Sequence, residues 1–171
     1  MLNPKIQDAF NKHLNAELYS SYLYLSMTAY FESQNLKGMA SWMRIQAQEE
    51  LQHALKFFDF IHERGGNVLL APVEGPKTDW SSPLAVFEAT YEHECKVTGL
   101  INNLVSLCIS EKDHAANTFL QWFVTEQVEE EAASQEVRDK LRLVSDNAVA
   151  LFMMDQELAK RVPAAPPAVG A

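Results

Sequence analysis

The sequence is short of the residues that interrupt helices. Among its 171 residues are only 6 Gly and 7 Pro, and three of the prolines lie within the last nine residues. Both residue types destabilise helix interiors, and no stretch alternates apolar and polar residues as a half-exposed strand does. This scarcity argues against a turn-rich β fold and favours long helices. Hydrophobic residues make up 47% of the chain, which is enough to build a core.

Basic residues are also few. The chain has 14 Lys and Arg against 23 Asp and Glu, and its formal net charge is −9. This balance argues against a nucleic-acid partner, whose phosphates bind basic surfaces, and it is compatible with the binding of cations. The first residues lack the apolar run of a signal peptide, and no run of about 20 apolar residues predicts a membrane span. We therefore expect a cytoplasmic protein without a membrane partner, in which Cys95 and Cys108 stay reduced.

Capping residues, Pro and Gly divide the chain into five predicted helices. The signals are Asn3-Pro4, Asn35 to Gly38, Gly65-Gly66, Ser82-Pro83, Asp113 and Ser145-Asp146. The predicted helices span residues 4–33, 37–64, 83–110, 114–143 and 146–161. They form one domain over residues 1–162, and a flexible Pro- and Ala-rich tail follows at 163–171.

The connections between the helices predict their order in space. Short connections make the first and second helices antiparallel neighbours, and the third and fourth likewise. Residues 66–82 reach at most about 56 Å when extended, which exceeds the roughly 42 Å length of each main helix. We therefore expect an all-α four-helix bundle of two antiparallel hairpins joined by a long crossover, with a short fifth helix.

Each of the four main helices carries a Glu on the seam that faces the core. Heptad spacing places Glu17, Glu50, Glu94 and Glu130 on these seams. Each Glu lies roughly 17 to 24 Å from the start of its helix, so all four fall near mid-height. One such Glu is ordinarily a boundary residue that reaches solvent, but four at one height, together with His53, indicate a common layer.

Four carboxylates without partners cannot share a dry core, because each unpaired buried charge costs several kcal/mol. They can take up protons, pair with basic groups or bind cations. No Lys or Arg lies nearby on these seams, and two divalent cations would neutralise the four charges. Carboxylates with one imidazole suit iron or manganese.

The spacing of the ligands resembles that of ferritin-like di-iron bundles. Those proteins use a Glu from each of two helices and a Glu-x-x-His from each of the other two. Here Glu50 and His53 form one such pair, but the fourth helix offers Gln127-x-x-Glu130 instead of the second. The predicted site is therefore asymmetric, with a His on one metal ion and only oxygen ligands on the other.

The whole stretch from residue 1 to about 160 resembles the bacterial non-haem ferritins. The most specific segments are residues 14–24 (LNAELYSSYLY), 48–53 (QEELQH), 119–122 (FLQW) and 126–131 (EQVEEE). The resemblance implies iron storage and detoxification. A ferroxidase centre would oxidise Fe(II) with dioxygen or hydrogen peroxide, and the ferric mineral would collect inside a cage of twenty-four subunits.

The resemblance also assigns roles to individual residues. One iron ion would be held by Glu17, Glu50 and His53, and the second by Glu50 as a bridge with Glu94 and Glu130, near Gln127. A third iron position would use Glu49, Glu126 and Glu129, with Glu130 shared. Tyr24 matches the tyrosine beside the centre, where it supplies an electron or holds Glu94. Bacterioferritins place a haem-binding Met at the position of Leu51, so we expect no haem.

Other interpretations stay open at this stage. Gln127 also fits a buried amide bonded to backbone, and the acidic run 126–131 is typical of a solvated face. We expect the histidines outside the E-x-x-H pair to lie on the surface; these are His13, His62, His93 and His114. Two other functions fit the helices: a di-iron or di-manganese oxidase or peroxidase without storage, and a structural bundle without redox chemistry.

Overall fold

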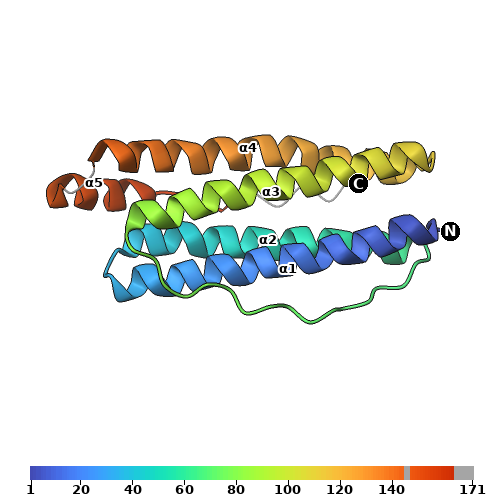
Figure 1. Cartoon of the computed structure of the whole chain (residues 1–171), viewed down its shortest axis with the longest axis horizontal. Coiled ribbons are helices and arrows are strands. Elements are labelled where there is room, and N and C mark those ends of the chain that lie inside the picture. Colours follow the sequence, from blue (N-terminus) through green and yellow to red (C-terminus); the bar gives the residue numbers. More distant parts are fainter. Residues whose placement is uncertain (145–146, 164–171) are drawn as a thin grey trace.

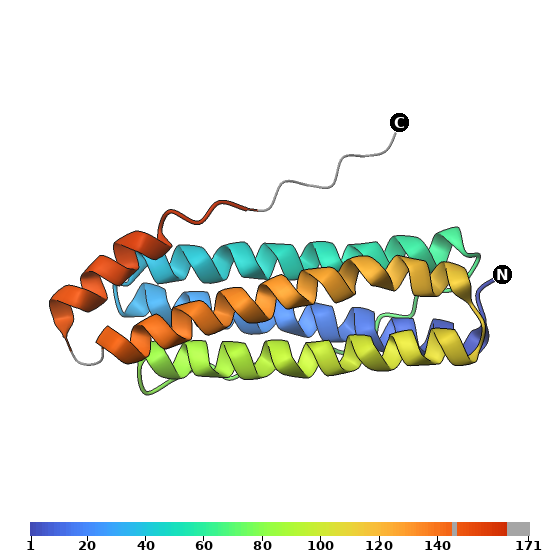
Figure 2. The same ribbon diagram turned by 90° about the horizontal axis from the view of Figure 1, so that it is seen from above.

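The computed structural model describes residues 1–144 and 147–163. Over these residues the chain folds into helices without any strand: α1 (Pro4–Ser33), α2 (Lys37–Glu63), α3 (Pro83–Ser110), α4 (His114–Val144) and α5 (Ala148–Leu158). The first four form two antiparallel hairpins, α1 with α2 and α3 with α4, and α5 lies across one end of the bundle (Figures 1 and 2). The predicted helical bundle with a short fifth helix is therefore confirmed. None of the described helices combines the length and apolar character needed to cross a membrane.

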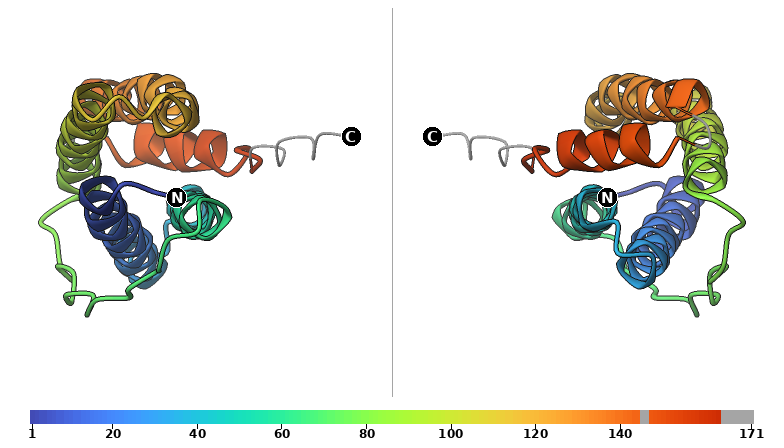
Figure 3. Two further views of the ribbon diagram at one scale, coloured as in Figure 1. Left: turned by 90° about the vertical axis from the view of Figure 1, so that its right-hand side faces the viewer. Right: turned by 90° about the vertical axis from the view of Figure 1, so that its left-hand side faces the viewer.

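The crossover between α2 and α3 runs along the side of α1 for the length of the bundle (Figures 1 and 3). It contains no helix, yet side chains of α1 hold it in place. The Asn11 side chain donates to the Asn67 carbonyl at 3.0 Å and accepts from the Leu69 backbone N–H at 2.7 Å. Further along, the Ser26 hydroxyl donates to the Lys77 carbonyl at 2.7 Å. The crossover lets α2 and α3 run parallel, as the sequence predicts.

Most helix starts match the capping residues named above. The side chains of Asn3, Ser82 and Asp113 each accept a backbone N–H from the first turn of α1, α3 and α4. The fifth helix differs from the prediction. Asn147 accepts the first N–H groups of α5, from Val149 and Ala150, and the helix ends at Leu158 and not at residue 161. Ser145 and Asp146 lie outside the described residues, as do residues 164–171 of the predicted tail.

The first turn of α2 is capped from a distance. Its N-cap residue, Leu36, makes no side-chain hydrogen bond. Instead the Asp155 carboxylate of α5 accepts the backbone N–H of Met39 at 2.9 Å. Because Gly38 has no side chain, the backbone of α5 comes close to it: an added Cβ would lie 1.7 Å from the Asp155 carbonyl oxygen. This close approach fixes α5, and the residues that follow it, on α2.

The core consists of two hydrophobic clusters along the bundle axis. The cluster toward α5 contains Tyr24, Met27, Phe31, Met43, Phe87 and Leu141. The cluster toward the opposite end contains Phe10, Leu14, Phe57, Ile101, Leu120 and Phe123. The seam glutamates lie between these clusters along their helices, so the two apolar regions enclose a polar layer.

Candidate metal centre

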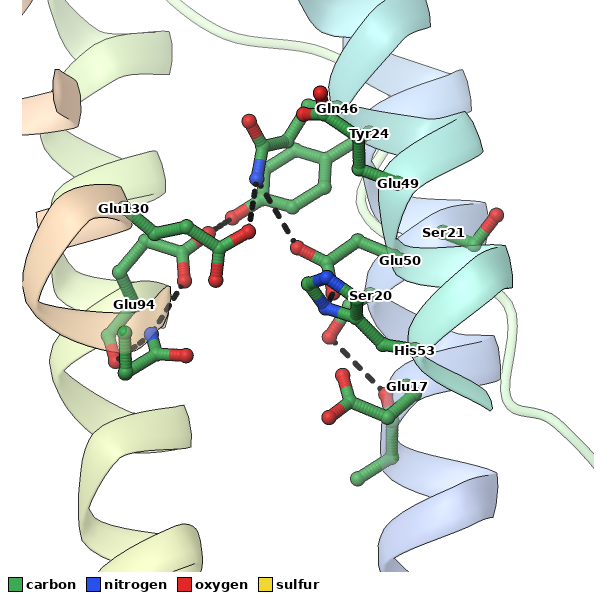
Figure 4. A network of polar contacts seen from close by, with 12 residues as sticks. Glu17, Ser20, Ser21, Tyr24, Gln46, Glu49, Glu50, His53, Glu94 and Glu130 are labelled. Carbon is green, nitrogen blue, oxygen red and sulfur yellow. Dashed lines mark hydrogen bonds and ion pairs between the residues drawn. The ribbon is translucent and has the colours of Figure 1, made fainter. Parts of the chain in front are cut away.

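Acidic side chains from all four long helices converge in the layer between the two core clusters (Figure 4). Glu17 comes from α1, Glu50 from α2 and Glu94 from α3, and all three are at most 2% exposed. Glu130 approaches them from α4, and His53 follows Glu50 by one turn of α2 (Figure 4). The structure thus brings together the residues that the seam spacing selects.

Two groups of ligand atoms can each hold a cation. In the first, atoms of Glu17, Glu50 and His53 lie within 4.8 Å of one another. In the second, the same holds for Glu50, Glu94 and Glu130. Because Glu50 belongs to both groups, its carboxylate can bridge two ions, as expected for a two-metal centre.

Burial and mutual repulsion raise the pKa values of three of these acids, Glu50, Glu94 and Glu130, in the metal-free protein. Burial, and then the charge of Glu50, raises the pKa of Glu94 to about 8. Burial and neighbouring carboxylates also raise the pKa values of Glu50 and Glu130 well above the usual range. Burial lowers the pKa of His53 and so favours the neutral imidazole, which is the form that binds metals. A metal ion bound in this layer would therefore displace protons from its carboxylates.

Glu17 has a partner that the sequence reasoning missed. His13 was expected on the surface, but its ring is buried on Phe57, with Nε2 2.8 Å from Glu17 Oε1. Burial raises the pKa of Glu17, but the charge and close contact of His13, together with the charge of His53, outweigh this effect, and the pKa falls below its usual value. Apart from this ion pair with His13, the carboxylate of Glu17 has no hydrogen-bond partner among the described residues, so Oε2 is available to a cation. Residues four apart lie on the same face of a helix, so the spacing of His13 and Glu17 indicates that the two side chains can meet.

His93 also departs from the prediction. It is half-buried, and its Nε2 lies 2.8 Å from the Ser20 hydroxyl, beside the Tyr24 ring. His62 and His114 are exposed, as expected. His13 and His93 therefore lie in the bundle interior near the polar layer, unlike His62 and His114.

Tyr24 and Gln127 both hold Glu94. The Tyr24 hydroxyl donates a short hydrogen bond to Glu94 Oε1. The Gln127 amide donates to Glu94 Oε2 at 2.7 Å and to the Glu94 carbonyl at 3.1 Å. From the sequence, Gln127 fits either a residue near the second iron ion or a buried amide bonded to backbone. It bonds both to backbone and to a carboxylate of the layer.

Gln46 is a further polar residue of the layer. It lies on the α2 seam one turn before Glu50 and is 2% exposed. Its amide donates to Glu50 Oε1 at 3.1 Å and to Glu130 Oε1 at 2.9 Å (Figure 4). Hydrogen bonds of this kind orient metal-binding carboxylates, and they link the second and fourth helices across the centre.

The acids expected at the third iron position form no ligand group of their own among the described residues, although the charges of Glu129 and Glu49 add to burial in raising the pKa of Glu126. Glu126 forms a group with His53 and Glu130, in which ligand atoms lie within 4.8 Å of one another. Glu49 instead pairs with Arg161, whose Nη2 lies 2.5 Å from its carboxylate. Glu129 is exposed and belongs to none of the groups found in residues 1–144 and 147–163.

A crossover bundle enclosing a layer of buried carboxylates defines a class of helical metal-binding proteins. Residues 7–144 match the Ferritin family, described as a ferritin-like domain. The chain is 43% identical over 161 residues to the bacterial non-heme ferritin of Bacteroides fragilis, an alignment that covers 94% of this chain and 100% of the relative. A probable bacterial non-heme ferritin-like protein of Haemophilus influenzae is 39% identical over 158 residues, or 92% and 96% of the two chains.

Among solved structures, the open-pore ferritin of Archaeoglobus fulgidus superposes with a TM-score of 0.93 and 52% sequence identity. The superposition covers 95% of this chain and 99% of that one. The chain therefore belongs to the bacterial non-haem ferritin family.

Proposed function

We propose that this protein stores iron and oxidises Fe(II) to Fe(III) at a two-iron centre inside each bundle. The main support for this proposal is the buried layer of carboxylates, in which Glu50 belongs to two separate ligand groups. Family membership supports the same function. The iron here is a substrate that passes through the centre to the stored mineral.

Each Fe(II) ion has its own set of ligands in this proposal. Glu17, Glu50 and His53 hold the first ion, and Glu50, Glu94 and Glu130 hold the second, with Gln127 nearby. The first set includes an imidazole, whereas the second has oxygen ligands alone. Hard carboxylates bind the more highly charged Fe(III) well, so they favour the oxidised product.

Two adjacent ions allow a two-electron reaction. Each Fe(II) gives one electron, so dioxygen and two protons yield hydrogen peroxide and two Fe(III). With hydrogen peroxide as the oxidant, two electrons and two protons yield two water molecules. Delivering the electrons together avoids release of a one-electron oxygen radical. Protons are at hand because the pKa of Glu94 lies at about 8 in the metal-free layer, and metal binding displaces them.

Iron then moves toward the store through a third position. Glu49, Glu126 and Glu129, with Glu130 shared, supply its carboxylates. The placement of Glu126 beside His53 and Glu130 supports a step between this position and the centre.

Storage requires a closed assembly, which we propose is a cage of twenty-four copies in the cytoplasm. Exposed apolar side chains on α5 support self-association, because contiguous apolar surface commonly marks an interface. Val149, Phe152 and Met153 are 63 to 70% exposed in the single chain.

Rapid-mixing kinetics of Fe(II) oxidation test the proposed centre. Glu50→Ala removes the shared ligand of both groups, so the fast phase of oxidation should be lost. Glu74→Ala removes an exposed acid of the crossover and serves as the control, with the fast phase retained. A full-rate fast phase in Glu50→Ala would contradict the site assignment.

A further inference from the structure

Arg161 connects the segment after α5 to the metal centre. It follows the last residue of α5 by three positions, and its side chain lies against α2. The guanidinium carbon lies 4.2 Å from the centre of the Trp42 ring, and Nη1 donates to the Trp42 carbonyl at 3.4 Å. Its Nη2 donates to Gln46 Oε1 at 2.9 Å and to Glu49 Oε2 at 2.5 Å. The guanidinium is thus held by an aromatic face, a backbone carbonyl, an amide and a carboxylate.

These contacts determine how Gln46 faces the metal centre. A guanidinium has donors only, so the amide oxygen of Gln46 must point toward Arg161. The amide nitrogen then points the other way, to Glu50 and Glu130, as the hydrogen bonds show. A continuous chain of hydrogen bonds therefore runs from the C-terminal segment to two carboxylates of the centre.

The pairing with Glu49 has a consequence for iron. Glu49 is one of the carboxylates of the third iron position in the proposed function, and Arg161 already places a positive charge on it. A cation attached to the same chain is a competitor of high effective concentration. An iron ion that uses Glu49 must displace the guanidinium or bind beside it against charge repulsion.

We propose that Arg161 is a positioning residue that competes with iron for Glu49, so that the segment after α5 sets the affinity of the third iron position. This inference rests on the proposed function, since it concerns the inward passage of iron from the same centre. Displacing Arg161 also releases the oxygen of Gln46, which couples the loading of the third position to the orientation of Glu50 and Glu130.

Anaerobic titration of the metal-free protein with Fe(II), followed by calorimetry, tests the competition. If Arg161 occupies Glu49 in about nine of ten molecules, its removal should tighten the third ion about tenfold. Arg161→Gln should therefore show this gain, and the binding of two further ions would show that the bundle is intact. Lys160→Gln removes a neighbouring exposed charge of the same segment and should leave all three ions unchanged.

The double variant Glu49→Gln/Arg161→Gln tests whether Arg161 acts through Glu49 or through its charge alone. If it acts through Glu49, the gain in affinity for the third ion should vanish when Glu49 is neutral. Equal affinity of the third ion in Arg161→Gln and the parent would overturn the proposal. A similar gain in Lys160→Gln, or a gain that survives in the double variant, would overturn it as well. Failure of the proposed function looks different, because the parent protein would then lack the two tight Fe(II) ions altogether.

Discussion

Glu94 shows how a single buried acid links the centre to pH. Its pKa is raised to about 8 by burial and by the charge of Glu50, against an unfolded value of about 4.3. The folded metal-free protein therefore holds this proton more tightly than the unfolded chain. The stabilisation is fully present below the unfolded pKa and is lost as the pH rises through 8, at up to about 1.4 kcal/mol per pH unit.

We expect the metal-free protein to lose thermal stability between pH 5 and 8, and Glu94→Gln to flatten this loss. The amide that replaces the Glu94 carboxyl is neutral at every pH, so the contribution of this side chain to the pH dependence of stability disappears. Thermal unfolding at a series of pH values measures the slope, and Glu92→Gln, which changes an exposed acid of the same helix, should keep the parent slope. An unchanged slope in Glu94→Gln would mean that this carboxyl does not hold the proton.

At the residue scale, the sequence predicted the layer and the contact between Tyr24 and Glu94, but not the other contacts that support the layer. The seam glutamates follow from heptad spacing and from their common height along the helices. His13 was misplaced because the buried stripe of a bundle helix is wider than its two main seam positions. Gln46 lies on the α2 seam, but its amide is uncharged, so its position alone does not predict a hydrogen bond to the carboxylates of the layer. Arg161 was out of reach, because only the docking of α5 brings it to Glu49.

At the element scale, α5 and α2 depend on one another. Asp155 caps the start of α2, and Gly38 allows the close approach of the two helices. Pro, Gly and capping residues predicted the bounds of α1 to α4 well, since each boundary has one clear signal. Before α5 the sequence has three good N-cap residues in a row, and the prediction used Ser145-Asp146, whereas Asn147 caps the helix. Only the packing of the helix selects among them.

Gly38→Ala should displace α5 from α2 and lower the midpoint of thermal unfolding. The new methyl group would meet a backbone oxygen, which cannot rotate away, so we expect a loss of about 1–3 kcal/mol. Gly99→Ala is the matched control. Its Cβ on α3 would meet nothing within 4 Å, and alanine favours the helix. Equal stability of the Gly38→Ala variant and the parent would show that the approach of α5 is not a constraint.

At the scale of the whole molecule, storage depends on assembly. A mineral needs a compartment, whereas the described residues of one chain form a bundle whose interior is filled by core side chains and the polar layer. Oxidation alone needs only the bundle. The alternative of an oxidase without storage therefore differs from a ferritin chiefly in oligomeric state.

Light scattering of the purified protein should give a mass close to twenty-four chains. The exposed apolar residues of α5 would then be covered by neighbouring copies. A monomer or dimer that still oxidises Fe(II) rapidly would instead favour the oxidase or peroxidase alternative.

The proposed function requires two iron ions to bind within the layer of seam glutamates. The most direct measurement is a crystal soaked in Fe(II) under air, with iron located by anomalous scattering. We expect two iron ions in each bundle, one at Glu17, Glu50 and His53 and the other at Glu50, Glu94 and Glu130. Iron found only on the surface, with none between the four helices, would contradict it.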